Sequence, residues 1–98
     1  MEAKIKYEFI SSIWKSPSAS WHFASLPESL SKEIRNNHQW EEEGWGRLKI
    51  IACINKLNWE TAIWFDTKLN TYLLPIKAEI RRKQNIKPKQ ELSITLYL

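Results

Sequence analysis

The sequence predicts one small, mainly β domain of the α+β class, with about six strands and two short helices. Three observations favour this fold class. The chain has 98 residues, of which 43% are hydrophobic and 12% aromatic, a composition that suits a single folded core and not a disordered chain. Hydrophobic and polar residues alternate over several short segments, as expected for strands with one wet face. Two other segments follow helical spacing and begin near a proline.

Six strands are predicted, either from this alternation or from hydrophobic residues on both faces. They span residues 4–9, 21–24, 47–54, 57–65, 72–74 and 91–98. In the first strand Ile5, Tyr7 and Phe9 are expected to share one face. Asn55 and Lys56 are expected to form a two-residue hairpin turn, because asparagine tolerates a positive φ.

Two helices are predicted, at residues 26–37 and 75–85. The first carries a hydrophobic stripe with four-residue spacing, formed by Leu26, Leu30 and Ile34. Pro27 suits its first turn, and Ser25 with Glu28 also has the spacing of a capping box, which would move the start by a residue. Pro75 suits the first turn of the second helix, where its missing N–H is not needed. The spacing in this helix places Ile76 and Ile80 inward, and Lys77, Arg81 and Arg82 outward.

Positive charge is concentrated in the second half of the chain. The net charge is +4, but residues 1–43 sum to −2 and residues 44–98 sum to +6. The excess peaks over residues 77–89, in Lys77, Arg81, Arg82, Lys83, Lys87 and Lys89. Such a surface is typical of phosphate contacts with nucleic acid. A solvated helix face, in which Glu79 pairs with Lys83, explains the same pattern.

The residue types offer little for catalysis. Cys53 is the one thiol and falls among hydrophobic residues, so we expect an inert core residue. His22 is expected at the surface or the rim, because no carboxylate is paired with it by sequence. His38 is expected as a solvated, cap-like residue at a helix end. The acidic residues 41–43 read as a solvated loop, because adjacent carboxylates cannot all face one cation. The sequence therefore favours a non-catalytic protein without a cofactor or metal.

The same composition indicates the compartment. One cysteine gives no disulfide framework, no hydrophobic run approaches the length of a membrane span, and the N-terminal residues lack a signal-peptide pattern. We therefore expect a cytoplasmic protein without a membrane partner.

Several blocks of the sequence follow a known pattern. The most specific are Trp-x-Phe-x-x-Leu-Pro at residues 21–27 and Leu-Leu-Pro-x-Lys-Ala-x-x-Arg at residues 73–81, joined by the blocks at residues 42–47 and 59–68. In order and spacing they resemble the bacterial domain-of-unknown-function family nineteen-oh-five, over essentially the whole chain. The resemblance implies a single domain over residues 1–98 with a double-split β-barrel, the barrel class of AbrB-type regulators and MazE-type antitoxins. It implies no established activity.

These observations lead to the hypothesis of a small, non-catalytic module that binds a ligand or a protein. Six tryptophans exceed what a small core buries deeply, so some rings either line a pocket or shield the barrel ends. On the family-like blocks, a pocket is expected near Trp64, Asp66, Lys68, Lys77 and Arg81. The alternative function is nucleic-acid binding through residues 77–89. Because the chain has enough strands to close its own barrel, we expect a monomer or a weak dimer.

Overall fold

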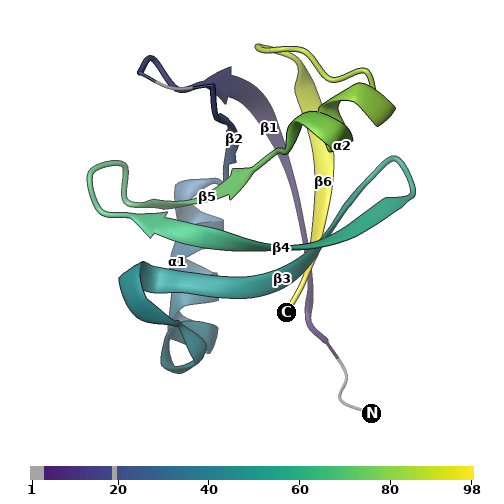
Figure 1. Cartoon of the computed structure of the whole chain (residues 1–98). Coiled ribbons are helices and arrows are strands. Elements are labelled where there is room, and N and C mark those ends of the chain that lie inside the picture. The colour runs from purple at the N-terminus through teal and green to yellow at the C-terminus, as the bar shows by residue number, and fades with distance from the viewer. Residues whose placement is uncertain (1–3, 19) are drawn as a thin grey trace.

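The protein forms a closed barrel of six antiparallel strands in the order β1-β2-β5-β4-β3-β6, in which β6 returns to β1 (Figure 1). The computed structural model describes residues 4–18 and 20–98, without the side chain of Trp45. The strands are β1 Lys6–Lys15, β2 His22–Ser25, β3 Arg47–Ile54, β4 Leu57–Asp66, β5 Thr71–Pro75 and β6 Glu91–Tyr97. The helices are α1 Glu28–His38 and α2 Ala78–Lys83, with two single 3-10 turns, η1 Gln39–Glu41 and η2 Gly44–Gly46. The predicted fold class, mainly β with six strands and two short helices, is confirmed.

The β3–β4 hairpin is the longest continuous pairing in the barrel. Its register runs from Arg47 opposite Trp64 to Ile54 opposite Leu57. The two turn residues, Asn55 and Lys56, have φ values of 48° and 71°. Positive φ at both positions is what a tight hairpin turn between right-twisted strands needs. The predicted turn is therefore confirmed.

The core lies inside the barrel and is built from alternate residues of each strand. The inward residues of three strands are Leu48, Ile50, Ala52 and Ile54 of β3, Tyr72 and Leu74 of β5, and Leu92, Ile94 and Leu96 of β6. Tyr7 and Phe9 are buried with them as predicted. Ile5, which is expected on the same face, is exposed because it precedes β1 at the end of the barrel.

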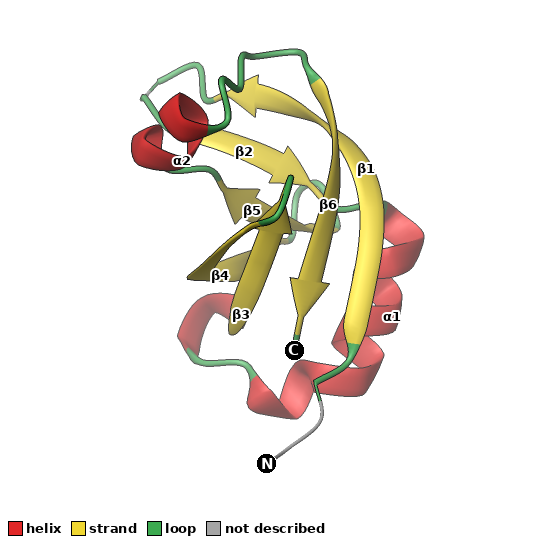
Figure 2. Ribbon diagram, turned by 90° about the vertical axis from the view of Figure 1, so that its right-hand side faces the viewer, coloured by secondary structure: helices red, strands yellow, loops and turns green. Residues whose placement is uncertain are grey.

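Helix α1 packs against the end of the barrel opposite to the end that carries α2 (Figures 1 and 2). Ile34 is fully buried against the core, and the hydroxyl of Ser31 accepts the backbone N–H of Tyr72 at 3.0 Å. The predicted capping box is wrong: the N-cap residue is Pro27, and no side chain caps the helix. Ser25 ends β2, and its hydroxyl accepts the indole N–H of Trp14 at 2.9 Å instead.

Helix α2 begins at Ala78, three residues later than predicted. Pro75 is the last residue of β5 and pairs with Phe23 of β2. A proline is tolerated at a strand end, where its missing N–H removes no ladder bond. Ile76 and Ile80 are buried as predicted.

The two ends of β4 have different neighbours, and this difference positions the candidate site. β3 pairs with β4 over residues 57–64, whereas β5 pairs only with the last three residues, Trp64, Phe65 and Asp66. Within the described residues, the β5-facing side of residues 57–63 has no strand partner. Because α2 directly follows β5, the segment before α2 lies beside this free part of β4 (Figure 1).

Candidate binding groove

A row of aromatic rings runs across the outside of the barrel. Trp14 of β1 lies 5.0 Å from Phe23 of β2, and Trp21 stacks on Phe23 at 6.0 Å, both measured between ring centroids. Trp21 and Trp64 of β4 are arranged edge to face, with their ring centroids 6.2 Å apart. Strand alternation explains the row, since the neighbours Ile13, Ala24 and Ile63 are fully buried inside.

These four residues (Trp14, Trp21, Phe23 and Trp64) form the aromatic row, and its most accessible ring is Trp21, which is 53% exposed. Trp14 is fixed by the hydrogen bond from its indole to Ser25. In turn, the backbone carbonyl of Ser25 accepts a hydrogen bond from the hydroxyl of Ser11 at 2.7 Å. The row is therefore held from beneath, while about half of Trp21 remains exposed to solvent.

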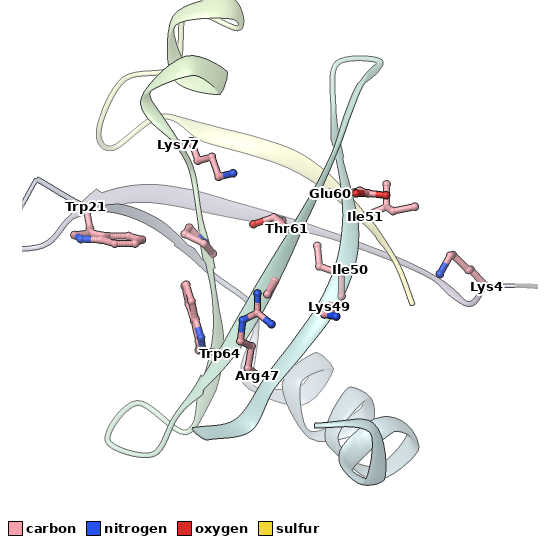
Figure 3. A pocket seen from close by; sticks show the side chains of 12 residues that line it. Lys4, Trp21, Arg47, Lys49, Ile50, Ile51, Glu60, Thr61, Trp64 and Lys77 are labelled. Carbon is pink, nitrogen blue, oxygen red and sulfur yellow. The ribbon is translucent and has the colours of Figure 1, made fainter. Parts of the chain in front are cut away.

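One end of the aromatic row borders a groove of about 600 Å³ on the outside of β3 and β4 (Figure 3). Ala62 is the small residue in its floor and is 3% exposed, between the larger outward residues Glu60 and Trp64. The groove is lined by Trp21, Trp64, Lys4, Arg47, Lys49, Lys77 and Glu60, with Ile50, Ile51, Thr61, Ala62 and Pro75. The groove follows the part of β4 that does not pair with β5. Thr61 of β4 and Lys77, which precedes α2, therefore lie across the groove from each other (Figure 3).

The groove is positively charged. Among the described residues, four basic side chains line it, against the one acidic side chain of Glu60. Glu43 partly neutralises two of the four, with an oxygen 2.7 Å from the guanidinium of Arg47 and another 3.7 Å from the ammonium of Lys49. Lys77 is exposed and has no ion-pair partner among the residues that the structure describes. Lys4 is likewise exposed and unpaired among these residues, so Lys4 and Lys77 are the two groove cations available to an incoming anion, and Lys77 is the one beside Trp21.

Two smaller hollows adjoin the groove and share Trp21 with it. The first, of about 330 Å³, lies over the aromatic row and is lined by Ser16, Trp21, Phe23 and Trp64. The second, of about 260 Å³, reaches the start of α2 and includes Lys77, Ala78 and Arg81. The guanidinium of Arg81 donates from Nε to the backbone carbonyl of Ile76 at 3.2 Å, and this hydrogen bond holds the side chain beside the hollow.

The structure brings together only some of the residues that the sequence grouped. Trp64 and Lys77 line the groove, and Arg81 lines the hollow beside it. Asp66 and Lys68 lie in the β4–β5 turn, where the carboxylate of Asp66 accepts the backbone N–H groups of Lys68 and Leu69 at 2.8 and 3.0 Å. Asp66 therefore holds the turn, and neither residue lines the groove or the two hollows.

The basic residues 77–89 are similarly divided. Lys77 and Arg81 face the groove and its neighbouring hollow, while Arg82 and Lys83 are exposed on α2. Lys83 pairs with Glu79 at 3.2 Å, the arrangement expected for a solvated helix face. Lys87 and Lys89 are exposed in the loop before β6.

Sequence reasoning did not select Trp21, Arg47 and Lys49. Arg47 and Lys49 alternate with Leu48 and Ile50, so their outward direction could be read from the strand pattern. Their place opposite Trp64 and Ala62 depends on the register of the hairpin. This register follows only when the residues that form the turn are known.

Three predictions about reactive side chains are wrong. His22 is buried, because it alternates inward with Ala24, and its Nδ1 lies 3.1 Å from the carbonyl of Ser20. His38 is also buried, because α1 carries it onto the barrel end; its Nε2 lies 3.1 Å from the Tyr7 hydroxyl. Cys53 is half-buried on the outer face of β3 and is not part of the core.

The acidic residues 41–43 are not a freely solvated loop. Glu41 lies 2.5 Å from Nδ1 of His38, Glu43 pairs with Arg47, and Glu42 accepts the hydroxyl of Tyr72 at 2.5 Å. Burial, and then the hydrogen bond and the charge of Glu42, raise the pKa of Tyr72 far above its ordinary value. These contacts attach the segment after α1 to the barrel.

Within residues 4–18 and 20–98, no three side chains of His, Cys, Asp or Glu converge as metal ligands would. The helices of the same residues include none long and hydrophobic enough to cross a membrane. No curated protein matches the chain. A family model does match, over residues 9–96 and thus over nearly the whole barrel, so the chain belongs to the family described as Domain of unknown function (DUF1905).

Proposed function

We propose that this domain is a non-catalytic binding module whose ligand carries a flat ring and a negative charge. The ligand occupies the groove on β3 and β4, with its ring against Trp21 and Trp64 and its charge near Lys77. The observation that carries the proposal is the meeting of an exposed aromatic row with a positively charged groove at these two tryptophans.

Each half of this chemistry has a physical reason. An exposed indole face binds flat, unsaturated rings through dispersion and its quadrupole. A cation without an ion-pair partner near it attracts an anion without first giving up an existing contact, and Lys77 is such a cation among the described residues. A ligand that supplies both a ring and a charge uses both features at once.

The surroundings of the groove support binding more than catalysis. Its titratable groups are the carboxylate of Glu60 and four cations, and among the described residues no histidine or cysteine lines it. The two histidines are engaged elsewhere, with Ser20, Tyr7 and Glu41. We place the protein in the cytoplasm because its one cysteine offers no disulfide framework. We expect a monomer or a weak dimer because the six strands close the barrel within one chain.

A two-dimensional NMR titration of the indole N–H signals tests the proposal. The probes are adenosine monophosphate, which has a ring and a charge, adenosine, which has the ring alone, and inorganic phosphate, which has the charge alone. We expect adenosine monophosphate to shift the signals of Trp21 and Trp64 at the lowest concentration of the three. The signal of Trp40, which is 82% exposed at the end of α1, should not move.

Two variants locate the site. Lys77→Gln should weaken adenosine monophosphate binding about two- to fivefold, the range expected for an exposed charge pair. Ala62→Leu should block the groove by filling its floor. Lys32→Gln on α1 removes the same charge elsewhere and should leave binding unchanged. If none of the three probes shifts Trp21 or Trp64, the proposed site does not bind this class of ligand.

The second candidate function is nucleic-acid binding through residues 77–89. One observation favours it: Lys77 and Arg81, the first two cations of this segment, lie beside the aromatic row and not away from it. The two candidates therefore meet at the same surface.

A further inference from the structure

We infer that the ligand of the groove is a single-stranded nucleic acid, with bases against the aromatic row and phosphates along the cations on both sides of it. This inference rests on the proposed function and names its ligand class. It joins the groove and the basic segment into one surface.

The first argument is the repetition of the site. Three adjoining hollows share Trp21, and two of them have cations of their own: Arg47 and Lys49 in the groove, and Arg81 beside α2. Figure 3 shows Lys77 and Arg47 on opposite sides of the groove, and Trp21 and Trp64 together at one end of it. A nucleic-acid strand repeats one base and one phosphate in every nucleotide, so it can place phosphates on both sides of a bound base.

The second argument concerns strandedness. In a duplex the base faces are hidden in the stack, so aromatic side chains bind bases only where these are unpaired. Proteins that bind single strands without sequence preference combine a positively charged groove with exposed aromatic side chains. The aromatic row and the cations of the groove are this combination, whereas an acidic peptide would leave the rings without a partner.

The third argument is the path beyond the groove. From Lys77 and Arg81 the chain continues through Arg82 to the loop that carries Lys87 and Lys89, both exposed. The backbone N–H of Lys89 donates to the carbonyl of Ile13 at 2.6 Å, so this loop is attached to the strand that carries Trp14. The basic segment therefore begins beside the groove and returns to the other end of the aromatic row.

Fluorescence anisotropy with labelled 12-nucleotide strands tests the inference. Oligo-dT and oligo-U are compared with a 12-base-pair duplex and with thymidine monophosphate as competitor. We expect either single strand, DNA or RNA, to bind at least tenfold more tightly than the duplex and the mononucleotide. If the four cations Arg47, Lys49, Lys77 and Arg81 each contact a phosphate, log K should fall with log salt with a slope of about −3.

Matched variants assign the binding to this surface. Trp21→Ala should weaken strand binding about 5- to 150-fold, as expected for the loss of one stacked base, and Trp21→Phe should restore most of it. Lys77→Gln should reduce the salt slope by about 0.7. Trp40→Ala and Lys32→Gln change the same residue types on or after α1 and should leave affinity and slope unchanged. Circular dichroism confirms that each variant is folded.

The outcomes separate this inference from the proposed function. If mononucleotides shift Trp21 and Trp64 but the 12-mers bind no more tightly, the strand is excluded and the small-ligand site stands. The inference is overturned if the duplex binds as tightly as the single strands. It is also overturned if the 12-mers bind Trp21→Ala and Lys77→Gln as tightly as they bind the wild-type protein. If neither mononucleotides nor strands bind, both fail.

Discussion

Replacing Tyr72 by phenylalanine measures how much the contact between the barrel and the segment after α1 stabilises the fold. Tyr72 is fully buried, and its hydroxyl donates to Glu42 at 2.5 Å. The Glu42 side chain is only 11% exposed, so water cannot replace the lost donor fully. A hydrogen bond to a charged group contributes about 1.5–3 kcal/mol. The phenyl ring remains, so no large cavity forms, and we expect the free energy of unfolding to fall by about 2 kcal/mol.

Urea unfolding at pH 7, followed by far-ultraviolet circular dichroism, gives this value. For a domain of this size a loss of about 2 kcal/mol lowers Tm by roughly 8–16 °C, and the m-value should not change. Tyr97→Phe is the control, since Tyr97 is half-buried and has no side-chain hydrogen bond among the described residues. A loss below about 0.5 kcal/mol for Tyr72→Phe would refute the reasoning.

The pH dependence provides an independent check with a definite sign. The pKa of Tyr72 is raised in the folded state, and in the unfolded chain it is about 10. Above pH 10 the unfolded state therefore binds fewer protons than the folded state, so stability falls as pH rises. The stability difference between the wild-type protein and Tyr72→Phe should narrow between pH 9.5 and 11. A constant difference would contradict the raised pKa.

Three further changes probe the backbone and the core. Gly46 has a φ of +71°, and a Cβ there would lie 3.0 Å from the Cβ of Phe65; Gly46→Ala should therefore lower stability by at least about 1–2 kcal/mol in urea unfolding. Asp66→Ala removes two hydrogen bonds to the β4–β5 turn; it should lower stability by about 1–2 kcal/mol, yet leave adenosine monophosphate binding unchanged by NMR. Ile34→Ala creates a cavity under α1, with an expected loss of about 2–5 kcal/mol by calorimetry.

The strands were predictable from the sequence because their signal is local. Alternation over residues 47–54 and 57–65 determined which side chains enter the core, and the Asn55–Lys56 turn then determined the register between them. From that register alone, Arg47 and Lys49 fall on the same outer face as Trp64. This part of the groove was therefore accessible to sequence reasoning.

Two of the parts that were mispredicted depend on contacts between distant segments. Pro75 has the spacing of a helix start, but its pairing with Phe23 keeps it in β5. His38 reads as an exposed helix end, but α1 packs it onto Tyr7, which is 31 residues away in sequence. Asp66 lies two residues after Trp64, on the same strand face, but the following turn draws its carboxylate onto the backbone N–H groups of Lys68 and Leu69. The partners of Pro75 and His38 lie in distant segments, which no local pattern contains, whereas the partners of Asp66 are local.

The pairing of β1 with β6 has a consequence for how the barrel forms. Because the first strand pairs with the last, from Lys6 opposite Tyr97 to Ser12 opposite Glu91, closure requires the two ends of the chain to meet. Contacts of such large sequence separation slow folding, and we expect refolding in milliseconds to seconds. Until β6 docks, β1 and β3 both present an unpaired edge to other chains, and exposed strand edges are templates for aggregation. Any partly folded form in which β6 is not yet docked is therefore prone to self-association through these two edges.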